Sequence, residues 1–129
     1  MSDNKDKEKA LFNLDELLNR TDGDKELACQ LMQMYLEQAD QNMADIEEAI
    51  AKKDSKRLQF VAHSLKGSSA DLSAESVRAL AYQMEKCGAS GELSGAPALL
   101  GPLKESLNNT KGLISRHLEG CAQSTKGAS

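Results

Sequence analysis

The chain has 129 residues, enough for one domain of ordinary size, and its formal net charge is −4. Binding to nucleic acid needs a clustered excess of lysine and arginine, so we expect no nucleic-acid partner. Tryptophan is absent and aromatic residues make up only 3% of the chain. Because alanine and aliphatic residues are plentiful, the composition favours helices over strands.

Three cysteines, Cys29, Cys87 and Cys121, are far apart, with no Cys-x-x-Cys spacing and no histidines beside them. This pattern supports neither a disulfide framework nor a zinc site, so we expect no metal and a reducing, cytoplasmic location. No segment approaches the roughly 18–20 apolar residues of a membrane span, and residues 1–9 lack the apolar core of a signal peptide. We therefore expect no direct membrane contact, although an anchor could lie in a longer parent protein.

Both ends of the chain are small, polar and charged, so residues 1–10 and 120–129 are predicted to be flexible tails around a bundle of residues 11–119. Residues 11–20 are predicted to form a short amphipathic helix. The Thr-Asp-Gly-Asp turn after it ends that helix, and Asp22 or Asp24 can cap the next one.

A long second helix is predicted from near Asp24 to about Lys53, because this segment contains no proline and no glycine. Its apolar side chains recur three or four residues apart: Leu27, Leu31, Tyr35, Ala39, Met43, Ile46 and Ile50. Four methionines are expected to fill the core: Met32, Met34, Met43 and Met84.

A third helix is predicted to start with Asp54 or Ser55 as its cap. Its apolar positions share one face: Leu58, Val61, Ala62, Leu65, Ser69 and Leu72. Ser73 is predicted to cap a fourth helix that ends at Gly88. The apolar positions of that helix are Val77, Leu80, Ala81 and Met84.

The last helix follows a segment rich in glycine and serine. It begins either near Ser94, with Pro97 in its first turn and Pro102 as a kink, or at Pro102 itself. Its apolar positions are Leu100, Leu103, Leu107, Thr110, Ile114 and Leu118. Four long amphipathic helices joined by short turns predict an all-α fold, an antiparallel up-and-down four-helix bundle with a short extra N-terminal helix.

His63 is the candidate reactive group. At about 100° per residue, it falls roughly 140° from the centre of the apolar face of its helix, so it should face solvent. Lys66 and Gly67 follow at i+3 and i+4, on the same surface. A neutral imidazole has one nucleophilic nitrogen, a nearby lysine can stabilise a phosphoryl group on it, and a glycine leaves room for a partner.

The surroundings of His63 suit a docking partner and a supporting hydrogen bond. One exposed aromatic and several small residues form the expected docking surface: Phe60, Ser64, Ser68 and Ala70. If the third and fourth helices form an antiparallel hairpin, Tyr82, Gln83 and Glu85 lie within about a turn of His63. One of them could accept a hydrogen bond from the second imidazole nitrogen and so fix the tautomer.

The segment of residues 62–72, Ala-His-Ser-Leu-Lys-Gly-Ser-Ser-Ala-Asp-Leu, resembles the signature of the histidine-containing phosphotransfer (HPt) domains of bacterial multistep phosphorelays. The resemblance covers residues 11–118. It implies that the outer nitrogen of His63 takes a phosphoryl group from an aspartyl phosphate on one receiver domain and gives it to an aspartate on another. Lys66 and Gly67 match the motif, and Glu85 matches the position where a Glu or Gln often hydrogen-bonds the histidine, with Gln83 as a second supporting candidate.

The resemblance further implies that this chain binds no nucleotide or metal cofactor, since the receiver domain supplies Mg²⁺. The expected partners are receiver domains of response regulators or a hybrid sensor kinase, and the chain is expected to be a monomer. One departure concerns Ser73, because the family usually has glycine there, which leaves the geometry of that turn open.

Two other functions remain open from the sequence. The chain could be the phosphoacceptor domain of a chemotaxis-type kinase, phosphorylated from ATP by a separate catalytic domain. It could instead be a non-catalytic helical adaptor in which His63 is incidental. We do not expect a self-sufficient enzyme, because no Gly-rich nucleotide loop, catalytic triad or metal cluster can be assembled from these residues.

Overall fold

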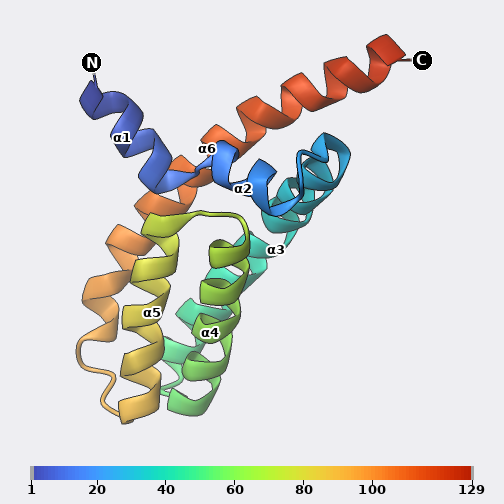
Figure 1. Cartoon of the computed structure of the whole chain (residues 1–129). Helices are drawn as coiled ribbons and strands as arrows, with labels where there is room; N and C mark the ends of the chain where they lie inside the picture. The colour runs from blue at the N-terminus through green and yellow to red at the C-terminus, as the bar shows by residue number, and fades with distance from the viewer. Residues whose placement is uncertain (1, 129) are drawn as a thin grey trace.

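The computed structural model describes the backbone of residues 2–128 and the side chains of residues 7–120. That backbone is helical and contains no strand, which confirms the predicted all-α class (Figure 1). The helices are α1 (Ser2–Leu11), α2 (Leu14–Arg20), α3 (Lys25–Ala51), α4 (Ser55–Asp71), α5 (Glu75–Ser90) and α6 (Ala96–Ala128).

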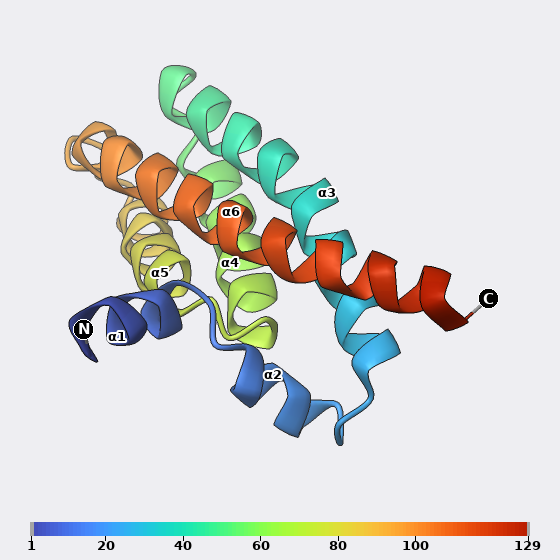
Figure 2. The ribbon, with the colours of Figure 1, turned by 90° about the horizontal axis from the view of Figure 1, so that it is seen from above.

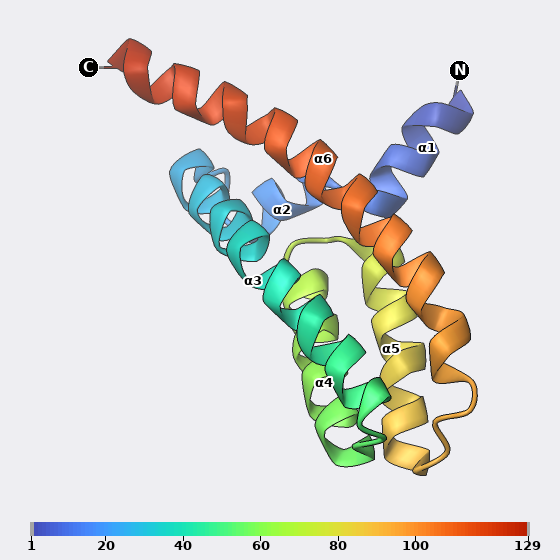
Figure 3. The same ribbon diagram turned by 180° about the vertical axis from the view of Figure 1, so that it is seen from behind.

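Helices α3 to α6 form the antiparallel up-and-down bundle that the sequence predicts. In Figure 1 the chain runs down α3, up α4, down α5 and up α6. Helix α3 packs against α4 and α6, and α5 also packs against both of these helices. Figure 2 shows α1 and α2 at one end of the bundle, and Figure 3 shows α6 continuing past that end.

The apolar face of α4 is buried as predicted, from Leu58 to Leu72. In α3 the buried set differs from the prediction and consists of Ala28, Met32, Tyr35, Ala39, Met43, Ile46 and Ala49. Leu27 is 40% exposed and Met34 is 59% exposed, so the prediction that both lie in the core is wrong. The apolar face of α3 is wider than the strip that its neighbours cover, and these two side chains lie on the uncovered edge.

Side-chain caps set the starts of two long helices. The Asp24 carboxylate accepts a hydrogen bond from the backbone N–H of Leu27 (3.0 Å), and Asp54 accepts one from Arg57 (3.1 Å). Helix α5 instead follows Ala74 without a side-chain cap, so the prediction that Ser73 caps it is wrong. It also runs past Gly88 to Ser90.

Glycine ends α5 at a position other than the predicted one. Gly91 has a φ of +76° and serves as the C-cap, because glycine adopts this left-handed conformation at little cost. Helix α6 begins at Ala96 with Pro97 in its first turn and Pro102 inside it, which confirms the earlier of the two predicted starts. At the first turn a proline removes no hydrogen bond that the helix would otherwise make.

The predicted tails are helical in their described part. Helix α1 covers residues 2–11 and α6 continues to residue 128, so the described backbone at both ends is helical, while the predicted flexibility of these segments stays a prediction. The first predicted helix also starts later, at Leu14, because Phe12 turns into the core and is only 4% exposed.

Cys87 is a free thiol, whereas Cys29 is disulfide-bonded, which corrects the expectation of no disulfide.

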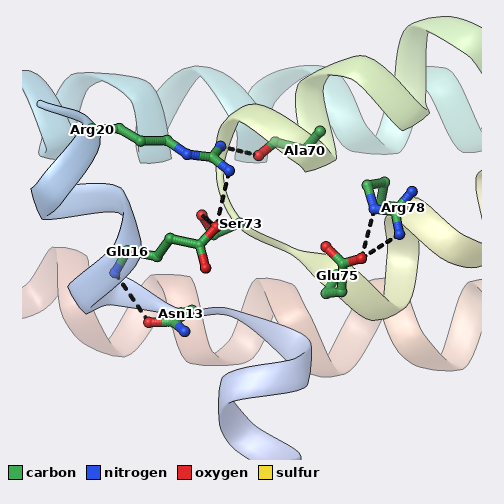
Figure 4. Close-up of polar contacts among 7 residues, drawn as sticks. All are labelled: Asn13, Glu16, Arg20, Ala70, Ser73, Glu75 and Arg78. Atoms are coloured by element: carbon green, nitrogen blue, oxygen red, sulfur yellow. Dashed lines mark hydrogen bonds and ion pairs between the residues drawn. The ribbon is translucent and has the colours of Figure 1, made fainter.

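Helix α2 is fastened to the turn between α4 and α5 (Figure 4). Ser73 in that turn has a φ of +59°, a conformation that favours glycine. Its hydroxyl donates to Glu16 (3.0 Å), and its carbonyl accepts from the backbone N–H of Asn13 (3.1 Å). Arg20 donates to the carbonyl of Ala70 and pairs with Glu16 (2.9 Å). The left-handed turn therefore forms without glycine, supported by polar contacts to α2.

Candidate functional site

His63 lies on the outer face of α4, and 66% of its side chain is exposed. Its position follows from the helical period, because Leu58, Val61, Ala62 and Leu65 on the opposite face are buried in the bundle. The ring is therefore held on a rigid element while one edge remains open to solvent.

Glu85 on α5 provides the hydrogen-bond partner of the imidazole. Its Oε2 lies 2.7 Å from Nδ1 of His63. Among the described residues this contact is made by Glu85 and not by Gln83, which is exposed. A carboxylate can only accept, so Nδ1 carries the proton, and Nε2 keeps the lone pair that a nucleophile needs.

Lys66 binds the other oxygen of the same carboxylate. Its Nζ lies 2.6 Å from Oε1 of Glu85, whose side chain is only 15% exposed. Burial is the largest single effect on Glu85 and raises its pKa. The hydrogen bonds and charges of Lys66 and His63 together outweigh burial, so the pKa of Glu85 lies below its usual range. Glu85 is therefore an ionised carboxylate shared by an imidazole and an ammonium group.

Tyr82 adds an aromatic ring beside this cluster. The Nζ of Lys66 lies 5.1 Å from the centre of the Tyr82 ring, and the Nζ of Lys86 lies 4.8 Å from it. Both distances fall within the range of cation–π attraction. The Tyr82 ring is thus contacted by two ammonium groups, of which Lys66 also binds Glu85.

Gly67 and Gly88 have opposite environments. A Cβ on Gly67 would meet nothing within 4 Å, so this glycine leaves open surface beside His63. A Cβ on Gly88 would lie 2.5 Å from the backbone nitrogen of Gln59 and 2.8 Å from the carbonyl oxygen of Ser55. The backbones of α5 and α4 are therefore in close contact at Gly88, one turn after Glu85.

Sequence reasoning missed this packing role of Gly88. A usable signal was present, because Gly88 continues the buried series Val77, Ala81 and Met84 at helical spacing. A small residue on the buried face of a helix is the pattern expected where two helices approach closely. The placement of the glycine near the predicted end of the helix suggested a terminator instead.

The surface around the ring contains the residues expected for docking. Phe60 is 74% exposed, Ser64 is exposed, and Ser68 and Ala70 are half-buried. The exposed Met34 belongs to the adjacent α3. The next residue, Tyr35, fixes the position of α3 along α4, because its hydroxyl forms a hydrogen bond with the hydroxyl of Ser69 at 2.8 Å.

In the part of the chain whose side chains are described, no three His, Cys, Asp or Glu side chains are grouped so that they could hold a metal ion. Within that part, no helix has the length and hydrophobicity needed to cross a membrane. The site itself offers one imidazole, one carboxylate, two ammonium groups and exposed small and aromatic side chains.

Comparison with known proteins identifies the family. The family model of the Hpt domain matches residues 30–113, which include His63, Lys66, Gly67 and Glu85. The chain belongs to the Hpt domain family. The resemblance seen in the sequence around His63 is thereby confirmed.

Two curated relatives of this Hpt chain are phosphorelay proteins by name. Over 75 residues it is 36% identical to multistep phosphorelay regulator 1 of Schizosaccharomyces pombe, covering 57% of this chain and 25% of the relative. Over 104 residues it is 25% identical to phosphorelay intermediate protein rdeA of Dictyostelium discoideum, covering 81% and 41%. The matched part of the chain therefore spans less than half the length of either relative.

Two solved structures share the fold of this Hpt chain. One is histidine-containing phosphotransfer protein B of Pseudomonas aeruginosa, with a TM-score of 0.79 and 19% identity, covering 84% of this chain and 95% of the other. The second is the HPT domain of the Hpt sensor hybrid histidine kinase of Shewanella, with a TM-score of 0.78, 17% identity, and coverage of 87% and 97%. At these identities the likeness concerns the fold.

Proposed function

We propose that this chain is a phosphorelay intermediate. Nε2 of His63 accepts a phosphoryl group from an aspartyl phosphate of one receiver domain and passes it to the aspartate of another. The observation that carries the proposal is the pairing of an exposed imidazole with the Glu85 carboxylate at 2.7 Å, because it leaves Nε2 outward and nucleophilic. The names of the curated relatives favour the same role.

Each member of the site has a distinct part in this proposal. His63 is the residue that is phosphorylated. Glu85 orients the ring and fixes the tautomer. Lys66 keeps Glu85 ionised and supplies positive charge beside the dianionic phosphoryl group. Gly67 leaves the space that an in-line approach to Nε2 requires.

The receiver domain would dock across the outer face of α4. Phe60 provides an exposed aromatic contact, and the small side chains of Ser64, Ser68 and Ala70 let a second protein approach closely. Met34 on α3, a helix that packs against α4, is also an exposed apolar side chain, and we include it in the proposed docking surface. An exposed, unbranched thioether suits an interface that must fit more than one receiver domain.

The remaining functional expectations belong to the same proposal. The partners are receiver domains of response regulators or of a hybrid sensor kinase. The chain itself acts without a nucleotide or a metal cofactor and is not an enzyme alone, since the receiver domain supplies the acceptor aspartate and the catalytic pocket. We expect a cytoplasmic monomer without direct membrane contact.

Phosphoryl transfer from a phosphorylated receiver domain tests the proposal. The protein should acquire label that is labile in acid and stable in alkali, as a phosphorus–nitrogen bond is, and His63→Gln should abolish the label. His117→Gln is the matched control, because it removes the other histidine of the chain and should leave labelling intact.

Two results would reject the proposed role as a phosphorelay intermediate, each in favour of a different function. Labelling only by a histidine kinase with ATP would favour the phosphoacceptor domain of a chemotaxis-type kinase, which the names of the relatives do not support. No labelling by either donor, together with full partner binding by the His63→Gln variant, would favour a non-catalytic adaptor.

A further inference from the structure

We propose that the Glu85 carboxylate keeps the phosphorylated ring of His63 protonated at Nδ1, so that the phosphohistidine remains a ready donor at neutral and mildly alkaline pH. The proposal rests on the proposed function and assigns the choice of a carboxylate at this position a role beyond orientation. It concerns the phosphorylated state, in which the ring must act as a leaving group.

Glu85 places a negative charge next to Nδ1 of His63. Oε2 of Glu85 lies 2.7 Å from Nδ1, and the carboxylate is 15% exposed, so solvent screens the contact only in part. An adjacent anion stabilises a cationic ring, and a charged hydrogen-bond partner does so more strongly than a neutral one.

Other groups around the ring determine how large this effect is. Lys66 on α4 shares the Glu85 carboxylate at 2.6 Å and opposes a positive ring. Lys86 on α5 lies over the Tyr82 ring at 4.8 Å and is a second positive charge that opposes a positive ring. Glu85 is the anion in contact with the ring, and the two lysines reduce its effect.

The transfer steps balance without moving a proton. Nε2 attacks phosphorus with its lone pair, and the donor aspartate leaves as a carboxylate. The ring retains its Nδ1 proton and becomes a cation facing Glu85. In onward transfer the electron pair of the N–P bond returns to Nε2 while the acceptor carboxylate binds phosphorus, so the ring leaves as neutral imidazole. Loss of the Nδ1 proton beforehand would require an imidazolide anion to leave, which is a far poorer leaving group.

Glutamine at position 85 would separate orientation from charge. Its amide oxygen can accept the same hydrogen bond from Nδ1–H but carries no net charge. The phosphorylated ring of Glu85→Gln should therefore lose its proton at a lower pH than that of the natural protein. Above both midpoints a difference of one pH unit means about tenfold less protonated ring.

The full chain, phosphorylated on His63 with potassium phosphoramidate, allows a direct test. Nitrogen-15 NMR of the imidazole follows protonation of Nδ1 between about pH 5 and 9, and phosphorus-31 NMR follows hydrolysis of the phosphohistidine in the same samples. Glu85→Gln should lower the midpoint by about one unit and slow hydrolysis about tenfold at the alkaline end. Lys66→Met should raise the midpoint, because it removes the charge that opposes Glu85.

A control variant and two possible results test whether the charge of Glu85 keeps the phosphorylated ring protonated. Glu92→Gln removes an exposed carboxylate just beyond α5 and should leave the midpoint unchanged. If His63 is phosphorylated but titrates at the same pH in Glu85→Gln and in the natural protein, this inference is wrong while the proposed function stands. If phosphoramidate leaves His63 unlabelled in the folded natural protein, the proposed function fails first.

Discussion

Replacing Gly88 with alanine is expected to force α4 and α5 apart. The new Cβ would lie 2.5 Å from the backbone nitrogen and 2.8 Å from the Cα of Gln59, and 2.8 Å from the carbonyl oxygen of Ser55. Non-bonded carbon contacts are about 3.5–4.0 Å, so the two helices must separate by about 1 Å. Because all three obstacles are backbone atoms, no side chain can rotate away to make room.

The expected cost follows from two opposing effects. Overpacking typically costs about 1–3 kcal/mol, and a rigid backbone obstacle places Gly88→Ala near about 3 kcal/mol. Alanine gains about 1 kcal/mol over glycine in a helix interior. The variant should therefore be destabilised by about 2 kcal/mol.

Urea unfolding at pH 7, followed by circular dichroism, measures this difference, and Gly67→Ala is the matched control. Gly67 is also inside a helix, but a Cβ there meets nothing within 4 Å. The control should be stabilised by up to about 1 kcal/mol. The two substitutions are chemically identical, so opposite signs isolate the contact between α4 and α5.

Separation of the helices should also reach the site. A displacement of about 1 Å would lengthen the 2.7 Å contact between Glu85 and His63 beyond hydrogen-bonding distance, which the nitrogen-15 shift of Nδ1 in the unphosphorylated protein would report. A Gly88→Ala protein as stable as the natural one, with an unchanged Nδ1 signal, would show that the helices are not held at this distance by Gly88.

Three further outcomes are expected. Ser73→Gly and Ser73→Ala both lose the hydroxyl contact to Glu16, but only glycine adopts the left-handed backbone without strain. In urea unfolding the glycine variant should therefore be about 1–2 kcal/mol more stable than the alanine variant. Equal stability of the two variants would exclude backbone strain at Ser73. Met34→Gln should raise the KM for phosphoryl transfer from a receiver domain, while the unfolding free energy stays within about 0.5 kcal/mol of the natural value. An unaltered KM would show that Met34 is not part of the docking surface. The pKa of Glu85 is lowered in the folded protein, so the ionised carboxylate stabilises the fold above the unfolded pKa of about 4.5, and this stabilisation is lost as pH falls through the folded pKa. The difference in unfolding free energy between the natural protein and Glu85→Gln should therefore shrink from pH 7 to pH 3. A difference that stays constant over this range would contradict the lowered pKa.

Local rules account for much of what the sequence predicted correctly. Asp24 and Asp54 were among the predicted caps, with Asp22 and Ser55 as the alternatives, because a carboxylate needs only the N–H three residues ahead. The exposed placement of His63 beside Lys66 and Gly67 followed from the helical period alone. These relations extend over one turn of helix, so no knowledge of the neighbouring helices was required.

Errors arose where a second element decided the outcome. Leu27 and Ala28 both fit an apolar face of α3, and only the positions of the neighbouring helices select Ala28 for burial. Ser73 is a good cap by type, yet the contacts of α2 hold it in a left-handed turn instead. Gly88 is a plausible terminator by composition, but its missing side chain lets α5 approach α4.

For the site, the sequence by itself brought together the candidate imidazole, its lysine and its open surface, because these lie on one face of one helix. Helical register left the choice among Tyr82, Gln83 and Glu85 open, since all three lie within a turn of His63, and the family resemblance favoured Glu85 without showing the contact. Only the packing of α5 on α4 decided that choice, by directing one side chain of the next helix at Nδ1 from 22 residues away. That contact joins two helices, and its distance depends on how closely their backbones approach.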